Sequence, residues 1–284
     1  MRFSWVRVVA VVAAVLVVAP AHAVPPVPFE QKPWSQLSDR HISDWGQDAL
    51  AIHSNSWIHV ETAHFIIHCF RDEDKIANRS EAFWGEIRDF FGNRPDLLQG
   101  RQSHIFAFHD LADWRAFVRS IGLANILGIT RGDEFFYLSI GANGYFDSNG
   151  RVQAHEMTHL IFNRLFRGRP PLWLNEGVAE YFGRRKTSSI IEFRRQMGQT
   201  PKFSLDRLFS SDTYPTGPLE IQAFYAEAAI VVDFLSYTED RRALLPKFIE
   251  AMINADDLDR ALAIYGYRNR AEFEADYARY RRRF

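Results

Sequence analysis

The sequence predicts an α+β protein, in which a segment of mixed strands and helices precedes a helical segment. Residues 64–140 alternate between β-rich runs and helical spacings, whereas the pattern after Arg151 is almost entirely helical. Of the 284 residues, 47% are apolar and 24% are charged, which suffices for a sizeable core. We expect one domain over 46–284, with an α/β lobe at about 46–168, a helical lobe at 169–284 and a cleft between them.

The first predicted elements are two strands and the helix between them. Residues 64–70 form a β-rich run, and residues 104–108 form a second one. Residues 76–91 have the apolar spacing of a helix, which we expect to end at Gly92.

A helix and a third strand follow. Asp110 or Asp113 is a candidate N-cap of the helix, whose apolar side begins with Trp114. Residues 134–140 (EFFYLSI) predict the strand, and a loop rich in Gly and Asn continues to Gly150.

Two helices then follow in close succession. The first is predicted over 151–166, with Ser148 or Asn149 as its cap. Residues 170–171, both proline, open the second, which we expect to end at Gly183.

The remaining chain is also predicted to be helical. A long helix is expected over 219–237. Two or three short helices follow, with boundaries near Asp256 and Gly266.

The N-terminus has the pattern of a secretory signal peptide, predicted over 1–23. Arg2 and Arg7 are basic, residues 8–19 are all apolar, and Ala-His-Ala at 21–23 is a small-x-small cleavage pattern. The alternative is an uncleaved anchor, but the apolar run is short for a bilayer. We therefore expect an exported protein, periplasmic or secreted, without stable membrane insertion after cleavage.

Composition restricts the partners and the cross-links. Residues 24–45 include a proline-rich stretch and are expected to be an extended lead-in. The net charge of −1 gives no reason to expect a nucleic-acid partner. Cys69 is the single cysteine, which excludes an internal disulfide and favours a buried small side chain.

The sequence His-Glu-Met-Thr-His at 155–159 is the first motif with chemical content. On a helix, His155 and His159 project from one face, so both imidazoles can reach one metal ion. Glu156 lies about 100° around the helix, which suits a base acting on metal-bound water. The alternative is a pair of surface histidines, but Val152 and Phe162 share their face and make it apolar.

A second motif supplies the remaining ligand. Residues 173–182 read Trp-Leu-Asn-Glu-Gly-Val-Ala-Glu-Tyr-Phe. A hydrolytic zinc site needs three protein ligands and one open position, and Glu176 can be the third ligand. Glu180 lies one turn later and can accept a hydrogen bond from a ligand histidine. The alternative is a solvated pair of glutamates, in a segment that is too apolar for it.

Together these motifs resemble those of the gluzincin clan of zinc metallopeptidases, both thermolysin-like and aminopeptidase-like, and are most similar to small exported bacterial members. The match covers residues 153–183. The gap from His159 to Glu176 is slightly shorter than in the best-known members. The aminopeptidase motif Gly-Ala-Met-Glu-Asn is absent, so the resemblance does not extend to aminopeptidase specificity.

The resemblance implies a cofactor, a reaction and a role for each residue. One Zn²⁺ per chain and a peptide or protein substrate are expected, with hydrolysis by Glu-assisted attack of zinc-bound water. The implied roles are metal ligand for His155, His159 and Glu176, general base for Glu156, and hydrogen-bond partner of a ligand histidine for Glu180.

Two further parts of the site are expected from the same resemblance. Tyr225 is the candidate donor to the oxyanion, with Tyr181 and Tyr214 as weaker candidates and a plain core aromatic as the alternative. In gluzincins the edge strand before the metal helix pairs with extended substrate. Residues 134–140 are the candidate for that strand, with a purely structural strand as the alternative.

Two other functions stay open at this point. One is a catalytically idle, zinc-containing envelope protein that holds peptides or glycan strands in the same cleft. The other is a structural protein without metal, which the number of candidate ligands disfavours. The remaining histidines, His64 and His68 among them, are expected to be structural because no third ligand is apparent near them.

Overall fold

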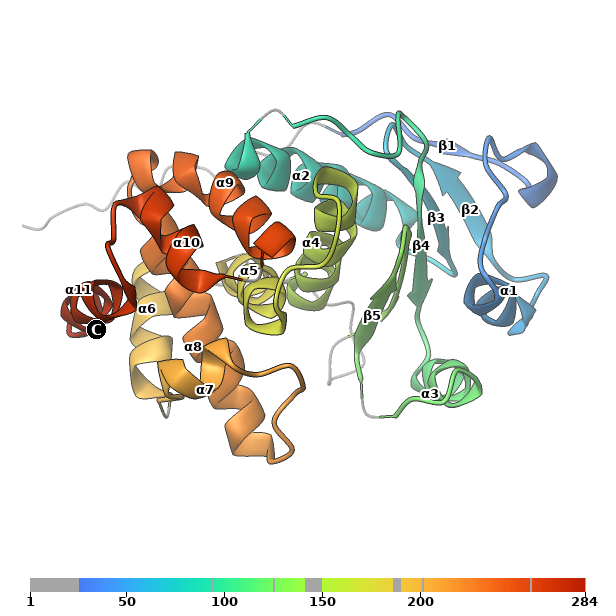
Figure 1. The fold of residues 1–284 in the computed structure, drawn as a ribbon. Helices are drawn as coiled ribbons and strands as arrows, with labels where there is room; N and C mark the ends of the chain where they lie inside the picture. The colour runs from blue at the N-terminus through green and yellow to red at the C-terminus, as the bar shows by residue number, and fades with distance from the viewer. Residues whose placement is uncertain are drawn as a thin grey trace, which may run out of the picture.

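The computed structural model confirms an α+β protein, with one six-stranded mixed sheet and many helices (Figure 1). It describes residues 26–92, 94–124, 126–140, 150–185, 190–200, 202–255 and 257–283. The predicted signal peptide, the candidate caps Ser148 and Asn149, and the boundary residue Asp256 lie outside the described residues.

The sheet has the strand order β1-β2-β3-β4-β6-β5. The strand bounds are β1 Glu30–Gln31, β2 Ile58–Glu61, β3 Phe65–Cys69, β4 Ser103–Phe108, β5 Gly128–Arg131 and β6 Glu134–Leu138. Strands β3, β4 and β6 are parallel, and the other pairs are antiparallel. The three predicted strands are confirmed as β3, β4 and β6, each within two residues of its expected bounds.

One edge of the sheet is β5, a strand that was not predicted from the sequence. Strand β6 is hydrogen-bonded to β4 on one side and to β5 on the other. The predicted strand at 134–140 is therefore an inner strand, and its backbone cannot pair with a further peptide. The prediction that residues 134–140 form the edge strand that pairs with substrate is wrong, and the alternative of a purely structural strand is correct.

The two faces of the sheet carry different helices. Phe106, Phe108 and Phe136 pack with α1 (Asp44–Ala51) and α3 (Leu111–Ser120) on one face. The side chains that alternate with them along the strands, such as Ile105 and Phe135, join a core with α2 (Glu73–Phe91) and α4 (Arg151–Leu165). This alternation follows from the period of two along a strand. Figure 1 shows α1 and α3 on the side of the sheet away from α2 and α4.

Helix α3 is capped by one of the two aspartates predicted for this role. The Asp110 carboxylate accepts hydrogen bonds from the backbone N–H groups of Ala112 and Asp113, so Asp110 is the N-cap and Asp113 is not. Helix α4 begins after Gly150, whose φ of 62° is in the left-handed region.

Three histidines, one each on β2, β3 and β4, form a row on the face of the sheet that packs against α1 and α3. The Nδ1 atoms of His59 and His68 lie 2.8 Å apart, and His68 Nε2 lies 3.0 Å from His104 Nδ1. His64 has a separate partner, since its Nδ1 lies 2.6 Å from Glu81 Oε2. His64 and His68 thus have different hydrogen-bond partners, and neither belongs to a group of three potential metal ligands among the described residues.

The proline-rich lead-in contacts the rest of the molecule. The backbone N–H of Val27 donates to Asn78 Oδ1 at 2.6 Å, and β1 pairs with β2. Leu37 is buried, and α1 begins at Asp44 with Ser43 as its cap. Among the described residues, no helix combines the length and apolar character that a bilayer crossing requires.

The second half of the chain is helical, as expected. Its helices are α5 Leu172–Arg185, α6 Ile190–Gln199, α7 Leu205–Phe209, α8 Pro218–Ser236, α9 Glu239–Ala255, α10 Leu258–Leu262 and α11 Arg270–Arg281. The helices predicted at 170–183 and 219–237 are confirmed as α5 and α8, while α6 and α7 were not expected. The division into two lobes stays a prediction.

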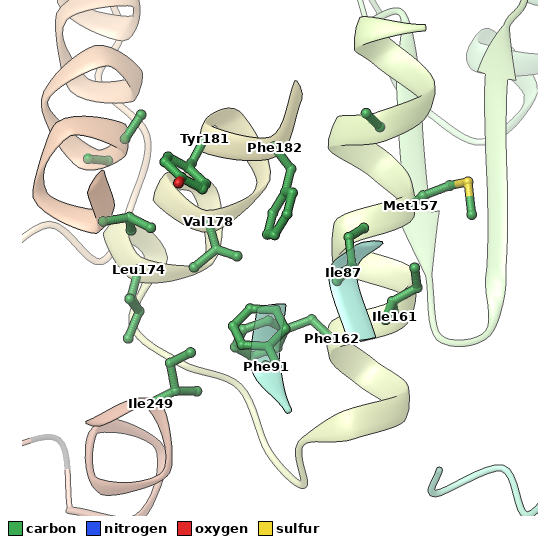
Figure 2. Packing of buried hydrophobic residues seen from close by; sticks show 14 of the residues in the cluster. Ile87, Phe91, Met157, Ile161, Phe162, Leu174, Val178, Tyr181, Phe182 and Ile249 are labelled. Atoms are coloured by element: carbon green, nitrogen blue, oxygen red, sulfur yellow. The ribbon is translucent and has the colours of Figure 1, made fainter. Parts of the chain in front are cut away.

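Helix α5 is held between α4 and α8. A Cβ atom on Gly177 would lie 2.7 Å from the backbone oxygen of Ala228 on α8, so only glycine fits this contact. On its other side, α5 sends Val178 and Phe182 into the core with Phe162 of α4 (Figure 2). The backbone of α5 is therefore fixed on two sides, and it carries the second of the two motifs.

Candidate metal centre

The structure brings His155, His159 and Glu176 together at the contact between α4 and α5. The two Nε2 atoms are 3.3 Å apart, and Glu176 Oε2 lies 3.4 Å from His155 Nε2 and 3.6 Å from His159 Nε2. Zinc bonds of about 2.0–2.2 Å at tetrahedral angles separate ligand atoms by roughly 3.3–3.6 Å. The three atoms therefore have the spacing that one zinc ion requires, and the group could hold a metal ion.

The three side chains are shielded from solvent without being sealed. The exposed fractions are 17% for the His155 side chain, 13% for His159 and 5% for Glu176. A catalytic metal site needs one side open to water and substrate, together with a largely dry surrounding. The two imidazoles supply the partly open side.

The charges at this point favour a cation. Burial works against a charged imidazole, but hydrogen bonds to Glu176 and Glu180 raise the pKa of His155 to about 10. Burial also opposes ionisation of Glu176, yet the charge of His159 and the hydrogen bond to His155 keep the pKa of this carboxyl well below its usual range. A site that stabilises one positive charge in this way is also suited to a metal ion.

Glu180 lies behind His155, as the sequence analysis expected. Its Oε2 is 3.4 Å from His155 Nδ1, the ring nitrogen that faces away from the other two ligands. Its Oε1 accepts a hydrogen bond of 2.9 Å from Arg151 Nη2 and another from Arg184 Nε. Burial raises its pKa, but the His155 contact and the two arginines outweigh this and lower the pKa to about 2. Glu180 is thus ionised and can hold His155 in one orientation.

His159 has its own supporting contact, which the sequence analysis missed. Its Nδ1 lies 3.2 Å from the side-chain oxygen Oδ1 of Asn175 on α5. A ring Nδ1–H that donates to Asn175 leaves Nε2 free as a metal ligand. Each of the two histidines therefore has one partner on α5. His159 contacts Asn175, one residue before Glu176, and His155 contacts Glu180, one turn after Glu176.

Glu180→Ala should weaken zinc binding by about 10–100-fold while the fold is kept, because His155 would lose the partner that orients its ring. The measurement is a zinc titration against a competing chelator. Glu192→Ala is a matched control, since Glu192 on α6 is partly exposed and pairs with Arg195 on the same helix. Unchanged zinc affinity in Glu180→Ala would show that this carboxylate does not support the metal.

Glu156 is held by the edge strand β5. The Thr130 hydroxyl lies 3.0 Å from both the Glu156 backbone oxygen and its Oε2, and a Cβ atom on Gly128 would lie 2.6 Å from Glu156 Cγ. Gly128 thus leaves space for the Glu156 side chain. Burial raises the pKa of Glu156, and the charges of His155 and His159 oppose this rise. A carboxyl with a raised pKa is suited to accept a proton and return it.

Two tyrosines reach the centre from the helical half. The Tyr214 hydroxyl donates a hydrogen bond of 2.6 Å to Glu176 Oε1, although the residue is 48% exposed. The Tyr225 ring on α8 lies 6.1 Å from the His155 ring and 6.3 Å from the Tyr214 ring. Burial, and then the charge of Glu176, raises the pKa of both hydroxyls, so both keep their protons. Tyr181 lies instead among the core side chains (Figure 2), and its hydroxyl accepts from Arg185.

Comparisons with known proteins add no family to this description. A scan against models of protein families gives no match, and a search of curated proteins finds no match either. The resemblance to gluzincins therefore stays a prediction, which rests on the motifs and on the geometry that the described residues adopt.

Proposed function

We propose that this protein is a zinc-dependent peptidase of the gluzincin type, which hydrolyses peptide bonds with Glu156 as general base. The observation that carries the proposal is the triangle of His155 Nε2, His159 Nε2 and Glu176 Oε2, with sides of 3.3–3.6 Å. Zinc held there would polarise a water molecule and the substrate carbonyl.

The roles of the surrounding residues follow from their positions. Glu156 takes a proton from the attacking water at Oε2 and delivers it to the leaving amine. Thr130 donates to that same oxygen and orients it. Tyr214 holds Glu176 Oε1, which leaves Oε2 for the metal. The Tyr225 hydroxyl donates to the oxyanion that forms as water adds to the carbonyl.

The edge strand β5 supports a peptide as the substrate. Its outer side is not paired with any other described strand, so it can bind the backbone of an extended peptide irrespective of sequence. Gly128 and Thr130 of this strand contact Glu156. A peptide paired along β5 would therefore run beside the base.

The test is cleavage of an unbiased peptide library by the purified protein loaded with zinc, with fragments identified by mass spectrometry. We expect cleavage by the parent protein and none by Glu156→Gln at equal zinc content. Binding of peptides or glycan strands without cleavage, with zinc bound, would contradict the proposal and favour the catalytically idle alternative.

The two tyrosines should respond differently to loss of the hydroxyl. Tyr225→Phe should lower kcat by about 10²–10³, the scale for one oxyanion donor, and leave the zinc content unchanged. Tyr214→Phe should mainly weaken zinc binding, because its hydroxyl contacts a ligand carboxylate. Steady-state kinetics and a zinc titration on both variants provide the comparison. A kcat for Tyr225→Phe within about threefold of the parent is less than 1 kcal/mol of barrier and would exclude its role.

A further inference from the structure

A hollow of about 630 Å³ lies where β5 begins, between α3 and the residues Leu123, Ala124, Ile126 and Leu127. Its wall is mostly apolar and includes Leu111, Trp114, Val118 and Leu127. Leu111 is 40% exposed and Leu127 is 57% exposed, so this wall is open to solvent. Apolar side chains that line an open hollow are typical of a surface that binds a ligand or partner.

Two arginines give the hollow a positive charge. Arg115 and Arg119 lie one turn apart on α3 and both line it. Both are exposed, and no ion pair or hydrogen bond of their guanidinium groups occurs with any described residue. Arginines in this position suit a ligand that combines an apolar group with a carboxylate.

The hollow continues directly into the strand beside Glu156. Leu127 precedes Gly128, and its backbone oxygen accepts from Leu138 of β6, so the pairing of β5 extends to this residue. Gly128 and Thr130 face α4, whereas Ile129 packs on the opposite face with the cluster that contains Trp114. Leu127 shares that opposite face because side chains alternate along a strand.

We propose that this hollow is a specificity subsite, which takes a bulky apolar side chain of an extended peptide whose neighbouring carboxylate is bound by Arg115 and Arg119. The inference rests on the proposed peptidase function. A peptide paired along β5 alternates its side chains, so that some face α4 and the metal centre while the next ones face α3 and the hollow. The preference for a bulky apolar side chain should therefore apply to one fixed position of the peptide, at a constant distance in sequence from the cleaved bond.

The first test compares matched peptides that differ at that position. The parent should cleave a Leu or Phe peptide with a kcat/KM at least about 10-fold above the Ala peptide, as expected for an apolar pocket. In Leu127→Asp the ratio should fall to about 2 or below. Ile191→Asp is the control, since Ile191 is 77% exposed on α6, and it should keep the parent ratio. An equal ratio in parent and Leu127→Asp would overturn the inference.

The second test concerns the carboxylate. A Glu peptide should be cleaved better than its Gln counterpart, or a free C-terminus better than an amidated one, and the comparison identifies the source of the carboxylate. The Arg115→Ala, Arg119→Ala double variant should lose the preference. Its retention would show that the arginines do not bind the substrate.

A binding measurement separates the subsite from the reaction. Cys69 is buried and burial raises its thiol pKa to about 12, so a thiol introduced by Ala124→Cys can be labelled selectively with an environment-sensitive dye. In zinc-loaded Glu156→Gln, the Leu peptide should shift the dye emission and the Ala peptide should not. Cleavage by the parent without such a shift would overturn the subsite alone.

The remaining outcomes are also distinct. A shift without any cleavage by the zinc-loaded parent would contradict the peptidase function and keep the peptide-binding hollow. A dimer in sedimentation that Leu127→Asp abolishes would identify a second copy of the chain as the occupant and overturn the inference.

Discussion

Glu156→Gln should lower peptide hydrolysis by about 10²–10⁴-fold and leave the zinc content unchanged. The amide has the shape of the carboxylate but cannot accept a proton from water. Its oxygen can still accept the hydrogen bond from Thr130, which lies 3.0 Å from Glu156 Oε2 in the native protein. The loss should therefore arise from the missing base and not from a displaced side chain.

The measurement is kcat/KM on one peptide from the library, with zinc determined by elemental analysis on the same sample. Glu192→Gln, at a partly exposed position on α6, is the control for the change from Glu to Gln. Near-normal turnover of Glu156→Gln with zinc bound would show that another group takes the proton.

His155→Ala, His159→Ala and Glu176→Ala should each release the metal from the dialysed protein. Each change leaves two ligands, fewer than the three protein ligands that catalytic zinc sites normally have. Glu176→Ala also removes the carboxylate that lies 3.4 Å and 3.6 Å from the two imidazoles and would balance the charge of a bound ion. Hydrolysis should disappear together with the zinc.

Elemental analysis after dialysis gives the zinc content per chain. His64→Ala is the matched control, since His64 pairs with Glu81 and lies outside the ligand group. It should keep the zinc content of the parent. Full zinc occupancy in any one of the three ligand variants would remove that residue from the ligand set.

The grouping of His155, His159 and Glu176 could be predicted because it depends largely on local geometry. His155 and His159 share a helix face at a spacing of four residues, and Glu176 and Glu180 repeat that spacing on α5. The same rule applies to Glu180 and Arg184, whose ion pair the sequence analysis overlooked. The strands β3, β4 and β6 were also predicted, since each is a run of apolar residues.

Other features depend on contacts between distant parts of the chain. Strand β5 is only four residues long and begins with Gly128, and its extended backbone comes from pairing with β6. Thr130 reaches Glu156 across 26 residues of sequence, and Tyr214 reaches Glu176 across 38. Tyr214 belongs to no helix or strand, so no periodic pattern could place its hydroxyl at the ligand carboxylate.

The close contact at Gly177 has a consequence for the thermodynamics of metal binding. Glu176 is the neighbouring residue, and the contact of Gly177 fixes the backbone of α5 there against α8. Ordering a flexible backbone costs about 1–2 kcal/mol of conformational entropy per residue. Here the packing of α5 against α8 supplies that order, so we expect the binding of an ion to need little further ordering of the Glu176 backbone. The affinity should therefore reflect the chemistry of the three ligand atoms, with little entropic penalty from the chain.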